Sequence, residues 1–293
     1  MFIATLIAKE SLNERDIQSA LASLNEAGAT TTRQSDLIDG RVIDFFFAGD
    51  PVAARAHLEK IGGQIDIAVQ PESNRIKKLL ISDMDSTMIT VECIDELADY
   101  AGIKPQIAEI TERAMQGELD FAEALHGRVA LLKGLDSAAI QQCLGERVKT
   151  MPGAETLVQT MVGSGAATIL VSGGFTKFAK PVAQAIGFES FHANVLGEED
   201  GALTGILDGP IVDSARKDEL LQSISQSADI PLALCMAVGD GANDIPMLQR
   251  AGLGVAYHAK PKAAQAADVA INHNDLTALL YIQGISADQW SRK

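Results

Sequence analysis

Several features that would point to particular protein classes are scarce in this sequence. Aromatic residues make up only 4% of the 293 residues, and 24 basic residues face 39 acidic ones, for a formal net charge of -15. That charge argues against a nucleic-acid partner, because no basic patch offsets the repulsion from phosphates. No apolar run reaches the roughly 20 residues that a bilayer-spanning helix needs. We therefore expect a soluble protein with no membrane partner.

Cysteine is equally rare. Cys93, Cys143 and Cys235 are too few and too dispersed for a disulfide framework, and their odd number leaves one unpaired. No Cys/His cluster has zinc-like spacing. Met1–Ala8 is apolar, but no basic region precedes it and Lys9–Glu10 ends it too early for a signal peptide. These observations predict a reduced, cytoplasmic compartment.

The first seventy residues carry an α+β pattern. Alternating apolar residues, helical spacings and glycine stops predict the order βαββαβ, with elements at Phe2–Ala8, Leu12–Ala27, Thr30–Ser35, Arg41–Ala48, Pro51–Lys60 and Gln64–Val69. This order suits a ferredoxin-like sandwich and resembles an ACT domain. Amino-acid-binding ACT domains usually carry a glycine turn after the first strand, where this chain reads Lys9–Asn13 without glycine. We therefore expect residues 1–70 to be a regulatory or dimerisation module, able to form a homodimer, with Pro71–Lys78 as a linker.

An apolar strand from Leu79 then ends in two aspartates, Asp83 and Asp85. Alternate side chains of an extended chain point the same way, so both carboxylates would face one volume beyond the strand's carboxyl end. Open α/β sheets bind ligands at that edge. Two carboxylates in a small volume suggest a cation or a shared proton, and an ordinary acidic turn is the alternative.

Helical segments without a strand signal follow, at Thr90–Gly102, Pro105–Gln116, Asp120–Lys133 and Asp136–Lys149. Because they lie between two candidate parallel strands, they predict an inserted helical cap over about residues 90–150, which could exclude water and supply substrate contacts. The guanidinium of Arg128 suits a carboxylate or a phosphate, and Glu92 lies near the aspartates. A surface salt bridge for Arg128 and a favourable helix-dipole contact for Glu92 are the alternatives.

The next strand, Ala166–Val171, follows a helix at Pro152–Ser164 and runs into Ser172–Gly173–Gly174. A hydroxyl and two glycines at a strand end let backbone N–H groups approach an anion, although a plain turn has the same composition. A helix is predicted from about Phe175, and we expect Pro181 to divide it.

A hairpin is predicted at Ser190–Leu196 and Ala202–Leu207, and a helix begins just before Lys217. The helix macrodipole disfavours a lysine in this position, so an anion there would explain it. A solvated basic pair is an equal alternative.

A buried strand at Leu232–Val238 runs into the sequence GDGAND, residues 239–244. Capping of the following helix, with Pro246 in its first turn, could explain Asn243 or Asp244, but it does not explain Asp240. Mg²⁺ takes few protein carboxylates together with water and substrate phosphate, and Asp83 and Asp240 on neighbouring strands supply that number. Short strands at Leu253–Val255 and Val269–Ile271 would extend the sheet.

Four motifs thus stand in order: DMDST at residues 83–87, SGG, a lysine, and GDGAND. Together they resemble the haloacid-dehalogenase superfamily of phosphotransferases. CIDELA after Glu92 and the cap sequence MQGELDFAEALHGRVALLKGL make the chain most similar to the phosphoserine phosphatases of that superfamily, over roughly Lys77 to Ser286. The resemblance implies an α/β fold, a doubly wound parallel-sheet core over residues 77–293 with the inserted cap, beside the N-terminal ferredoxin-like domain. It also implies hydrolysis of phosphoserine to serine and phosphate, the last step of serine biosynthesis.

The resemblance also implies roles for individual residues. Asp83 would be the nucleophile that forms an aspartyl-phosphate, and Asp85 the general acid and later the base. Mg²⁺ would be held by Asp83, Asp240 and the backbone carbonyl of Asp85, with Asp244 orienting these ligands. The substrate would be bound by Glu92 (ammonium), Arg128 (carboxylate), Phe121 (closing over it), Ser172, Gly173 and Lys217 (phosphate), and Asn243 (a further polar contact).

Two other functions fit parts of the sequence. One is a capped phosphatase or phosphotransferase for another small phosphomonoester, such as phosphohomoserine. The other is a catalytically silent amino-acid-binding regulator built on the N-terminal module. The second is disfavoured because every catalytic position of the motifs is filled.

Overall fold

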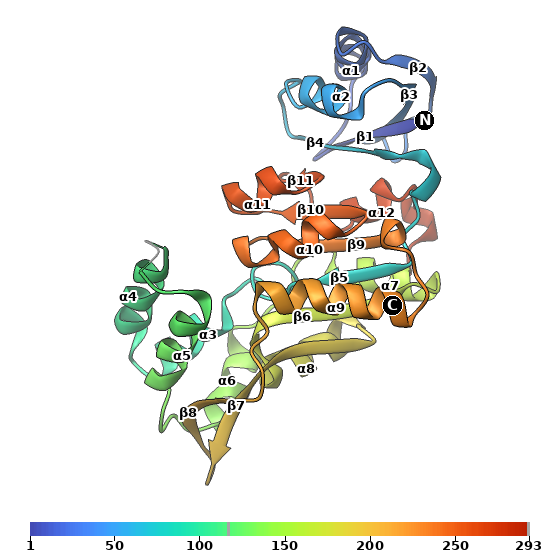
Figure 1. Ribbon diagram of the computed structural model, residues 1–293. Coiled ribbons are helices and arrows are strands. Elements are labelled where there is room, and N and C mark those ends of the chain that lie inside the picture. The colour runs from blue at the N-terminus through green and yellow to red at the C-terminus, as the bar shows by residue number, and fades with distance from the viewer. Residues whose placement is uncertain (116–117, 292–293) are drawn as a thin grey trace.

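The computed structural model describes residues 1–115 and 118–291, and its strands join into one eleven-stranded sheet (Figure 1). Across the sheet the strands follow the order β2-β3-β1-β4-β11-β10-β9-β5-β6-β7-β8. In chain order they are β1 (Phe2–Ala8), β2 (Thr30–Gln34), β3 (Val42–Ala48), β4 (Ile65–Pro71), β5 (Leu79–Ser82), β6 (Ala167–Phe175), β7 (Ser190–Glu199), β8 (Ala202–Asp208), β9 (Cys235–Gly239), β10 (Leu253–Tyr257) and β11 (Val269–Ile271).

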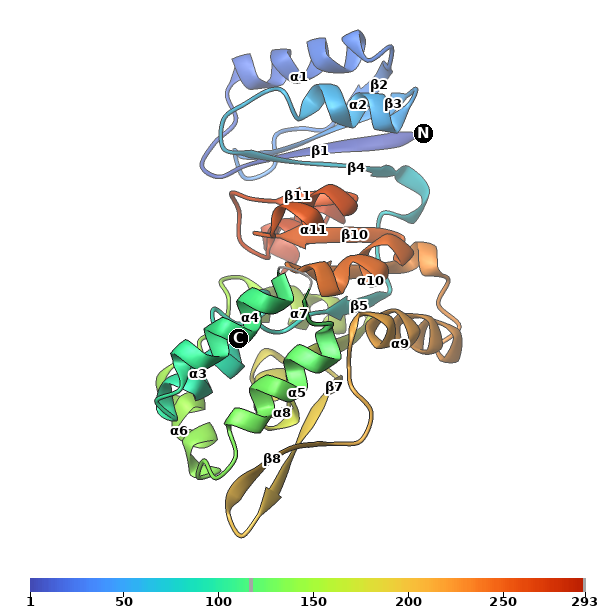
Figure 2. The ribbon, with the colours of Figure 1, turned by 60° about the vertical axis from the view of Figure 1, so that its left-hand side comes forward.

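The N-terminal part has the predicted order, β1-α1-β2-β3-α2-β4, with α1 at Glu14–Glu26 and α2 at Pro51–Leu58. Side chains cap both helices: Asn13 accepts from the N–H of Asp16, and Asp50 accepts from that of Val52. Both helices lie on one face of the antiparallel strands, as Figure 2 shows, and α12 (Ala278–Ile282) contacts β1 from the core side. Because both faces are covered, β1 is buried almost throughout.

The two halves of the sheet meet where β4 pairs with β11, through Ile67 and Ala270. The carboxylate of Asp66 accepts hydrogen bonds of 2.8–3.2 Å from the backbone N–H groups of residues 272–274. Beyond β4, in the segment predicted as a linker, the partly buried Arg75 forms a salt bridge of 2.7 Å to the buried Asp44 of β3. The N-terminal module is thus connected to the core in two ways, by strand pairing within the sheet and by the segment that follows β4.

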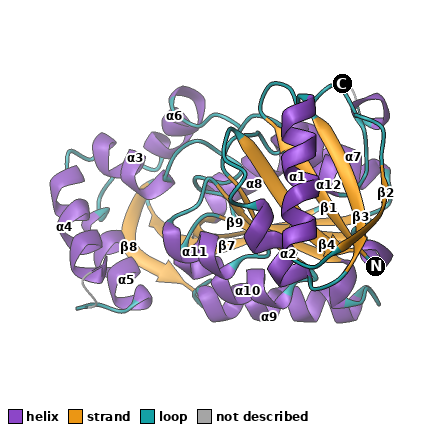
Figure 3. Ribbon diagram, turned by 90° about the horizontal axis from the view of Figure 1, so that it is seen from above, coloured by secondary structure: helices purple, strands orange, loops and turns teal. Residues whose placement is uncertain are grey.

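The core is doubly wound, as predicted. Strand β5 lies between β6 and β9 and is parallel to both. Its side chains alternate between two apolar clusters: Leu80 packs with α7 (Ala154–Gly163) and α8 (Thr176–Ile186), whereas Leu79 and Ile81 pack with α9 (Ser214–Ser227) and α10 (Ile245–Arg250). Seen from above in Figure 3, α9 and α10 lie on one side of the sheet and α7 on the other. A short helix, α11 (Pro261–Ala266), precedes β11.

The helical cap is also present, between β5 and β6. It consists of α3 (Cys93–Tyr100), α4 (Lys104–Met115), α5 (Phe121–Leu131) and α6 (Ala138–Glu146), and these helices lie together to one side of the core in Figures 1 and 2. The predicted end of one helix, Gln116, lies outside the described residues. Backbone hydrogen bonds of 2.8 and 2.9 Å join Gly134 and Leu135 to Leu203 of β8, so the hairpin braces the cap.

Three local predictions need correction. The prediction that Pro181 divides its helix is wrong: α8 continues through Pro181, because its buried apolar face offsets the one lost backbone hydrogen bond. Strand β6 runs on to Phe175, so the SGG motif lies within the strand. Strand β9 begins at Cys235, because Leu232–Leu234 forms a 3₁₀ turn.

Among the described residues, no helix combines the length and the apolar character that crossing a membrane requires.

Candidate active site

A cavity of about 370 Å³ lies beyond the carboxyl ends of β5, β6 and β9, facing the cap. Most of the predicted site residues line it: Asp83, Asp85, Glu92, Phe121, Arg128, Gly173, Asp240 and Asn243. The remaining three, Ser172, Lys217 and Asp244, are buried next to these residues. Residues more than 150 positions apart in the chain therefore meet where the parallel strands end.

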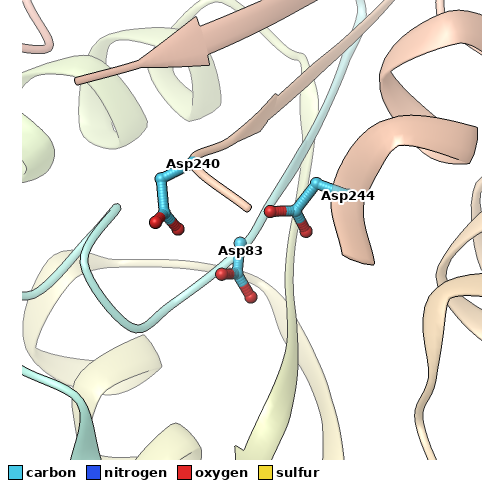
Figure 4. A group of neighbouring side chains, drawn as sticks. All are labelled: Asp83, Asp240 and Asp244. Atoms are coloured by element: carbon cyan, nitrogen blue, oxygen red, sulfur yellow. The ribbon is translucent and has the colours of Figure 1, made fainter. Parts of the chain in front are cut away.

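Three carboxylates form the polar centre of this site. Asp83 directly follows β5, and its N–H donates to Val238 of β9 at 2.9 Å. Asp240 directly follows β9, and Asp244 comes from the turn before α10. The ligand oxygens of the three lie within 4.8 Å of one another, and Figure 4 shows their side chains gathered in one place.

Lys217 stabilises two of these carboxylates. Its side chain is fully buried, and Nζ donates to Asp83 Oδ1 at 2.5 Å and to Asp244 Oδ1 at 2.7 Å. Burial would lower the pKa of Lys217, but the charges of Asp244 and Asp83 outweigh it, so the pKa is raised. Burial also raises the pKa of Asp83, with Asp244 adding to the effect and Lys217 opposing it. Lys217 is therefore a fixed buried cation, and the alternative of a solvated basic residue is wrong.

The carboxylate set fits a divalent cation. Three buried carboxylates share one buried ammonium, which leaves negative charge uncompensated in a low-dielectric site. Oxygen donors of this kind are the ligands that hard cations such as Mg²⁺ prefer. Burial, and then the charge of Asp244, raise the pKa of Asp240 to about 6.

Asp85 lies in the same cavity as Asp83, as the spacing predicted. Its Oδ1 accepts from the N–H of Cys93, the first residue of α3, at 3.2 Å. Burial, and then the charge of Glu92, raise the pKa of Asp85 to about 7. This carboxyl can therefore gain or lose a proton near neutral pH.

The SGG motif forms the part of the cavity wall next to Asp85. Ser172 Oγ accepts from the N–H of Gly174 at 2.8 Å. A Cβ atom at Gly174 would lie 2.8 Å from Asp85 Oδ2, and one at Gly173 would lie 3.2 Å from Phe121 Cζ. Glycine at both positions thus leaves room for the carboxyl on one side and for the cap's aromatic ring on the other.

Glu92 and Arg128 reach the cavity from the cap. Glu92 precedes α3 but makes no side-chain cap, and Oε1 accepts instead from Ser86 Oγ at 2.7 Å. Arg128 Nε donates to the carbonyl of Ala124 at 3.3 Å. Within residues 1–115 and 118–291 Arg128 forms no salt bridge, so the surface-salt-bridge alternative is not supported. Burial lowers the pKa of Arg128, and the charges of Asp95 and Glu92 oppose this.

Sequence reasoning missed three residues that contact the site. Thr87 is fully buried and its Oγ1 donates to Asp240 Oδ1 at 3.3 Å. Lys260 donates its N–H to the Asp240 carbonyl at 2.9 Å, and its Nζ lies 3.8 Å from Asp240 Oδ2. Asn194 of β7 binds the backbone of Gly173. Thr87 belongs to the DMDST motif, and Lys260 lies within the stretch from Lys77 to Ser286 over which the chain resembles the phosphoserine phosphatases. No motif pointed to Asn194.

Comparisons with known proteins identify the family of this chain. Residues 77–252 match a family model described as haloacid dehalogenase-like hydrolase. The chain is 39% identical over 275 residues to the phosphoserine phosphatase of Streptomyces coelicolor, covering 92% of this chain and 67% of that protein. It is 34% identical to the phosphoserine phosphatase of Saccharomyces cerevisiae, covering 98% of this chain and 97% of that protein. A solved structure described as a phospho-aspartyl intermediate analogue of phosphoserine phosphatase is 37% identical, with a TM-score of 0.65, covering 70% of this chain and 98% of that chain. With its carboxylate cluster, its cap and these relatives, the chain belongs to the haloacid dehalogenase-like hydrolases and, among them, to the phosphoserine phosphatase family.

Proposed function

We propose that this protein hydrolyses phosphoserine to serine and phosphate. The observation that carries the proposal is the composition of one cavity, where a carboxylate pair and a glycine-lined wall face Glu92 and Arg128 of the cap. The names of the two relatives described above support the same activity. The substrate has a phosphate, an ammonium and a carboxylate. In the cavity Arg128 and Glu92 carry charges opposite to the carboxylate and the ammonium, and a bound cation together with the buried Lys217 would offset the charge of the phosphate.

Asp83 is the nucleophile in this proposal. Lys217 holds Oδ1, and we assign the attack on phosphorus to Oδ2. The bond from phosphorus to the serine oxygen breaks as the bond to Asp83 forms, which gives an aspartyl-phosphate. The description of the 37%-identical structure as a phospho-aspartyl intermediate analogue supports this step.

Asp85 carries the proton in both halves of the reaction. Protonated, it donates to the departing serine oxygen, a poor leaving group without a proton. As a carboxylate it then takes a proton from the water that attacks the aspartyl-phosphate, which releases phosphate and restores Asp83. A pKa of about 7 supports both roles, because neither protonation state is costly at neutral pH.

Mg²⁺ is the cofactor that we infer. Asp83, Asp240 and the backbone carbonyl of Asp85 would hold it. When bound, the ion would neutralise negative charge on the carboxylates and on the substrate phosphate, so that the two anions can approach. Asp244 would orient these ligands: Lys217 donates to its Oδ1, and the N–H of Gly241 donates to its Oδ2 at 3.0 Å.

The remaining polar residues bind substrate. Ser172, Gly173 and Lys217 would receive the phosphate, with Asn243 as a further polar contact. Arg128 would bind the carboxylate and Glu92 the ammonium, while Phe121, at the start of α5, would cover the substrate above Gly173.

The deciding experiment compares kcat/KM for phosphoserine, phosphohomoserine and phosphoethanolamine, which lacks the carboxylate. We expect the wild type to prefer phosphoserine and Arg128→Met to lose that preference, with phosphoethanolamine hydrolysis unchanged. Arg113→Met on α4 is the matched control, because Arg113 is exposed and pairs with Glu118. Equal wild-type kcat/KM values for phosphoserine and phosphoethanolamine would refute the role of Arg128. A preference for phosphohomoserine would favour that alternative substrate. Activity retained in Asp83→Asn would refute the assignment of Asp83 as the nucleophile.

We also infer that residues 1–70 form a dimerisation or regulatory module of a cytoplasmic enzyme. Strand β2 lies at the edge of the sheet with most of its side chains exposed, which leaves an edge for another chain to join. All three cysteines are buried and free, in keeping with a reducing compartment. The mass of the full chain by light scattering tests the dimer, and a monomer at micromolar concentration would contradict it.

A further inference from the structure

The peptide bond between Gly173 and Gly174 lies in the cavity wall, where β6 and β7 lose register. Val171 pairs with His192, but the next pair is Phe175 with Asn194. Residues 172–174 of β6 therefore face a single residue of β7, and a regular ladder cannot satisfy all of their backbone groups. The groups in this bulge need other partners.

Two side chains hold this peptide from its two ends. Asn194 Nδ2 donates to the carbonyl oxygen of Gly173 at 2.8 Å, and Ser172 Oγ accepts from the N–H of Gly174 at 2.8 Å. With both polar groups bonded, the plane of the peptide is fixed. A rotation about its flanking bonds would have to break both hydrogen bonds.

Asn194 also has a second partner. Its Oδ1 accepts from the N–H of Val212 at 2.8 Å, and its side chain is almost fully buried, with 1% of the residue exposed. Val212 lies just before α9, the helix that carries Lys217. The two partners determine the orientation of the amide, since a carbonyl requires a donor and an N–H requires an acceptor. One side chain thus ties the glycine wall to the segment that leads to Lys217.

We propose that Asn194 is a positioning residue for phosphate binding: it turns the Gly173 carbonyl away from the phosphate site. A carbonyl oxygen pointing at a phosphate would repel it, whereas N–H groups attract it. The proposal rests on the phosphatase function proposed above and adds a residue that does not line the cavity. The competing explanation is that Asn194 only satisfies buried backbone groups and contributes to stability alone.

The test measures the inhibition constant of inorganic phosphate during hydrolysis of p-nitrophenyl phosphate. We expect Asn194→Ala to raise this constant, and the KM for phosphoserine, by a common factor of about ten, which corresponds to about 1.4 kcal/mol. Asn194→Asp should raise both as strongly, because a carboxylate still accepts from Val212 but cannot donate to Gly173.

Thr168→Val is the matched control. Thr168 is a fully buried polar residue on the same strand, and its Oγ1 accepts from the N–H of Glu189 at 3.2 Å. We expect it to lower Tm and leave the phosphate inhibition constant within about twofold of the wild type. If both Asn194 variants also had a lower Tm but a phosphate inhibition constant within about twofold of the wild type, the proposal would be overturned.

The outcomes also separate this inference from the proposed function. If the wild type hydrolyses p-nitrophenyl phosphate but not phosphoserine, the proposed substrate is wrong, and the phosphate inhibition constant still decides the role of Asn194. If Asn194→Ala does not fold, Asn194→Asp alone decides it.

Discussion

Replacing Lys217 by methionine would test how the site tolerates its own negative charge. The lysine is fully buried between Asp83 and Asp244, with hydrogen bonds of 2.5 and 2.7 Å. Methionine has a similar length, so the change removes the charge and leaves little empty space. Two buried carboxylates would then lie next to each other and next to Asp240 without a buried cation.

The expected loss of stability is large. Removing one partner of a buried ion pair typically costs about 3–5 kcal/mol, because the other charge stays buried and unpaired. In a chain of this size each kcal/mol lowers Tm by roughly 2–4 °C, so we expect a fall of roughly 10 °C in a chelating buffer. The difference should shrink toward pH 5, because burial already raises the pKa of Asp83 and losing Lys217 raises it further, so the carboxyl is protonated more readily.

Calorimetric unfolding of both proteins, with chelator and with Mg²⁺, provides the measurement. A bound cation should restore part of the lost stability, because it compensates the same carboxylates. Lys260→Met is the control. Lys260 Nζ lies 3.8 Å from Asp240 Oδ2, but the lysine side chain is 72% exposed, so the Tm of this variant should stay within about 2 °C of the wild-type value. A Lys217→Met protein as stable as the wild type in chelator would refute the reasoning.

Three further predictions follow from contacts described above. In chelator, the free energy of unfolding should fall as the pH rises from about 4 to about 7. Aspartates in the unfolded chain have a pKa near 3.9, whereas the pKa is about 6 for native Asp240 and about 7 for native Asp85, so the folded protein binds more protons in this range. Urea titrations at several pH values measure this change, and a free energy of unfolding that does not vary with pH would contradict those pKa values. Gly174→Ala would place a Cβ atom 2.8 Å from Asp85 Oδ2, so kcat should fall at least about tenfold, while Gly145→Ala, with open space around it, should leave kcat unchanged. Asp66→Ala would leave the donors of residues 272–274 without their acceptor and should cost about 3 kcal/mol in urea unfolding. Asp16→Ala, which removes an exposed carboxylate that accepts from the N–H of Asn13 at 3.0 Å, should cost less than about 1 kcal/mol, and equal losses would contradict a special role for this junction.

The fold and much of the site could be predicted from sequence because their signals are local. Strand β1 was predicted at its observed bounds from its apolar run, and the fold class followed from the order of elements. Asp83 and Asp240 could be placed together because both directly follow parallel strands, and strand ends of that kind share one edge of the sheet.

Other features depend on contacts that no local pattern records. Asn194 occupies an ordinary strand position, and its role arises only from the bulge in the neighbouring strand. The continuation of α8 through Pro181 depends on apolar burial that outweighs a local rule. The two carboxylates that bind Lys217 lie 134 and 27 residues away from it in the sequence. The residues next to Lys217 in the sequence therefore could not show whether its side chain is buried or solvated.

The pairing of β4 with β11 has a consequence for how the chain folds. Asp66 and its partner Asn272 are 206 residues apart, so during synthesis the edge of β4 stays unpaired until Asn272 and its neighbours have been made. Contacts of such long range form slowly, and an open strand edge invites pairing with other chains. A carboxylate on that edge discourages wrong pairing, because a foreign strand would have to bury the charge without the donors that satisfy it. We therefore expect the charge of Asp66 to disfavour such pairing until Asp66 joins the two halves of the sheet.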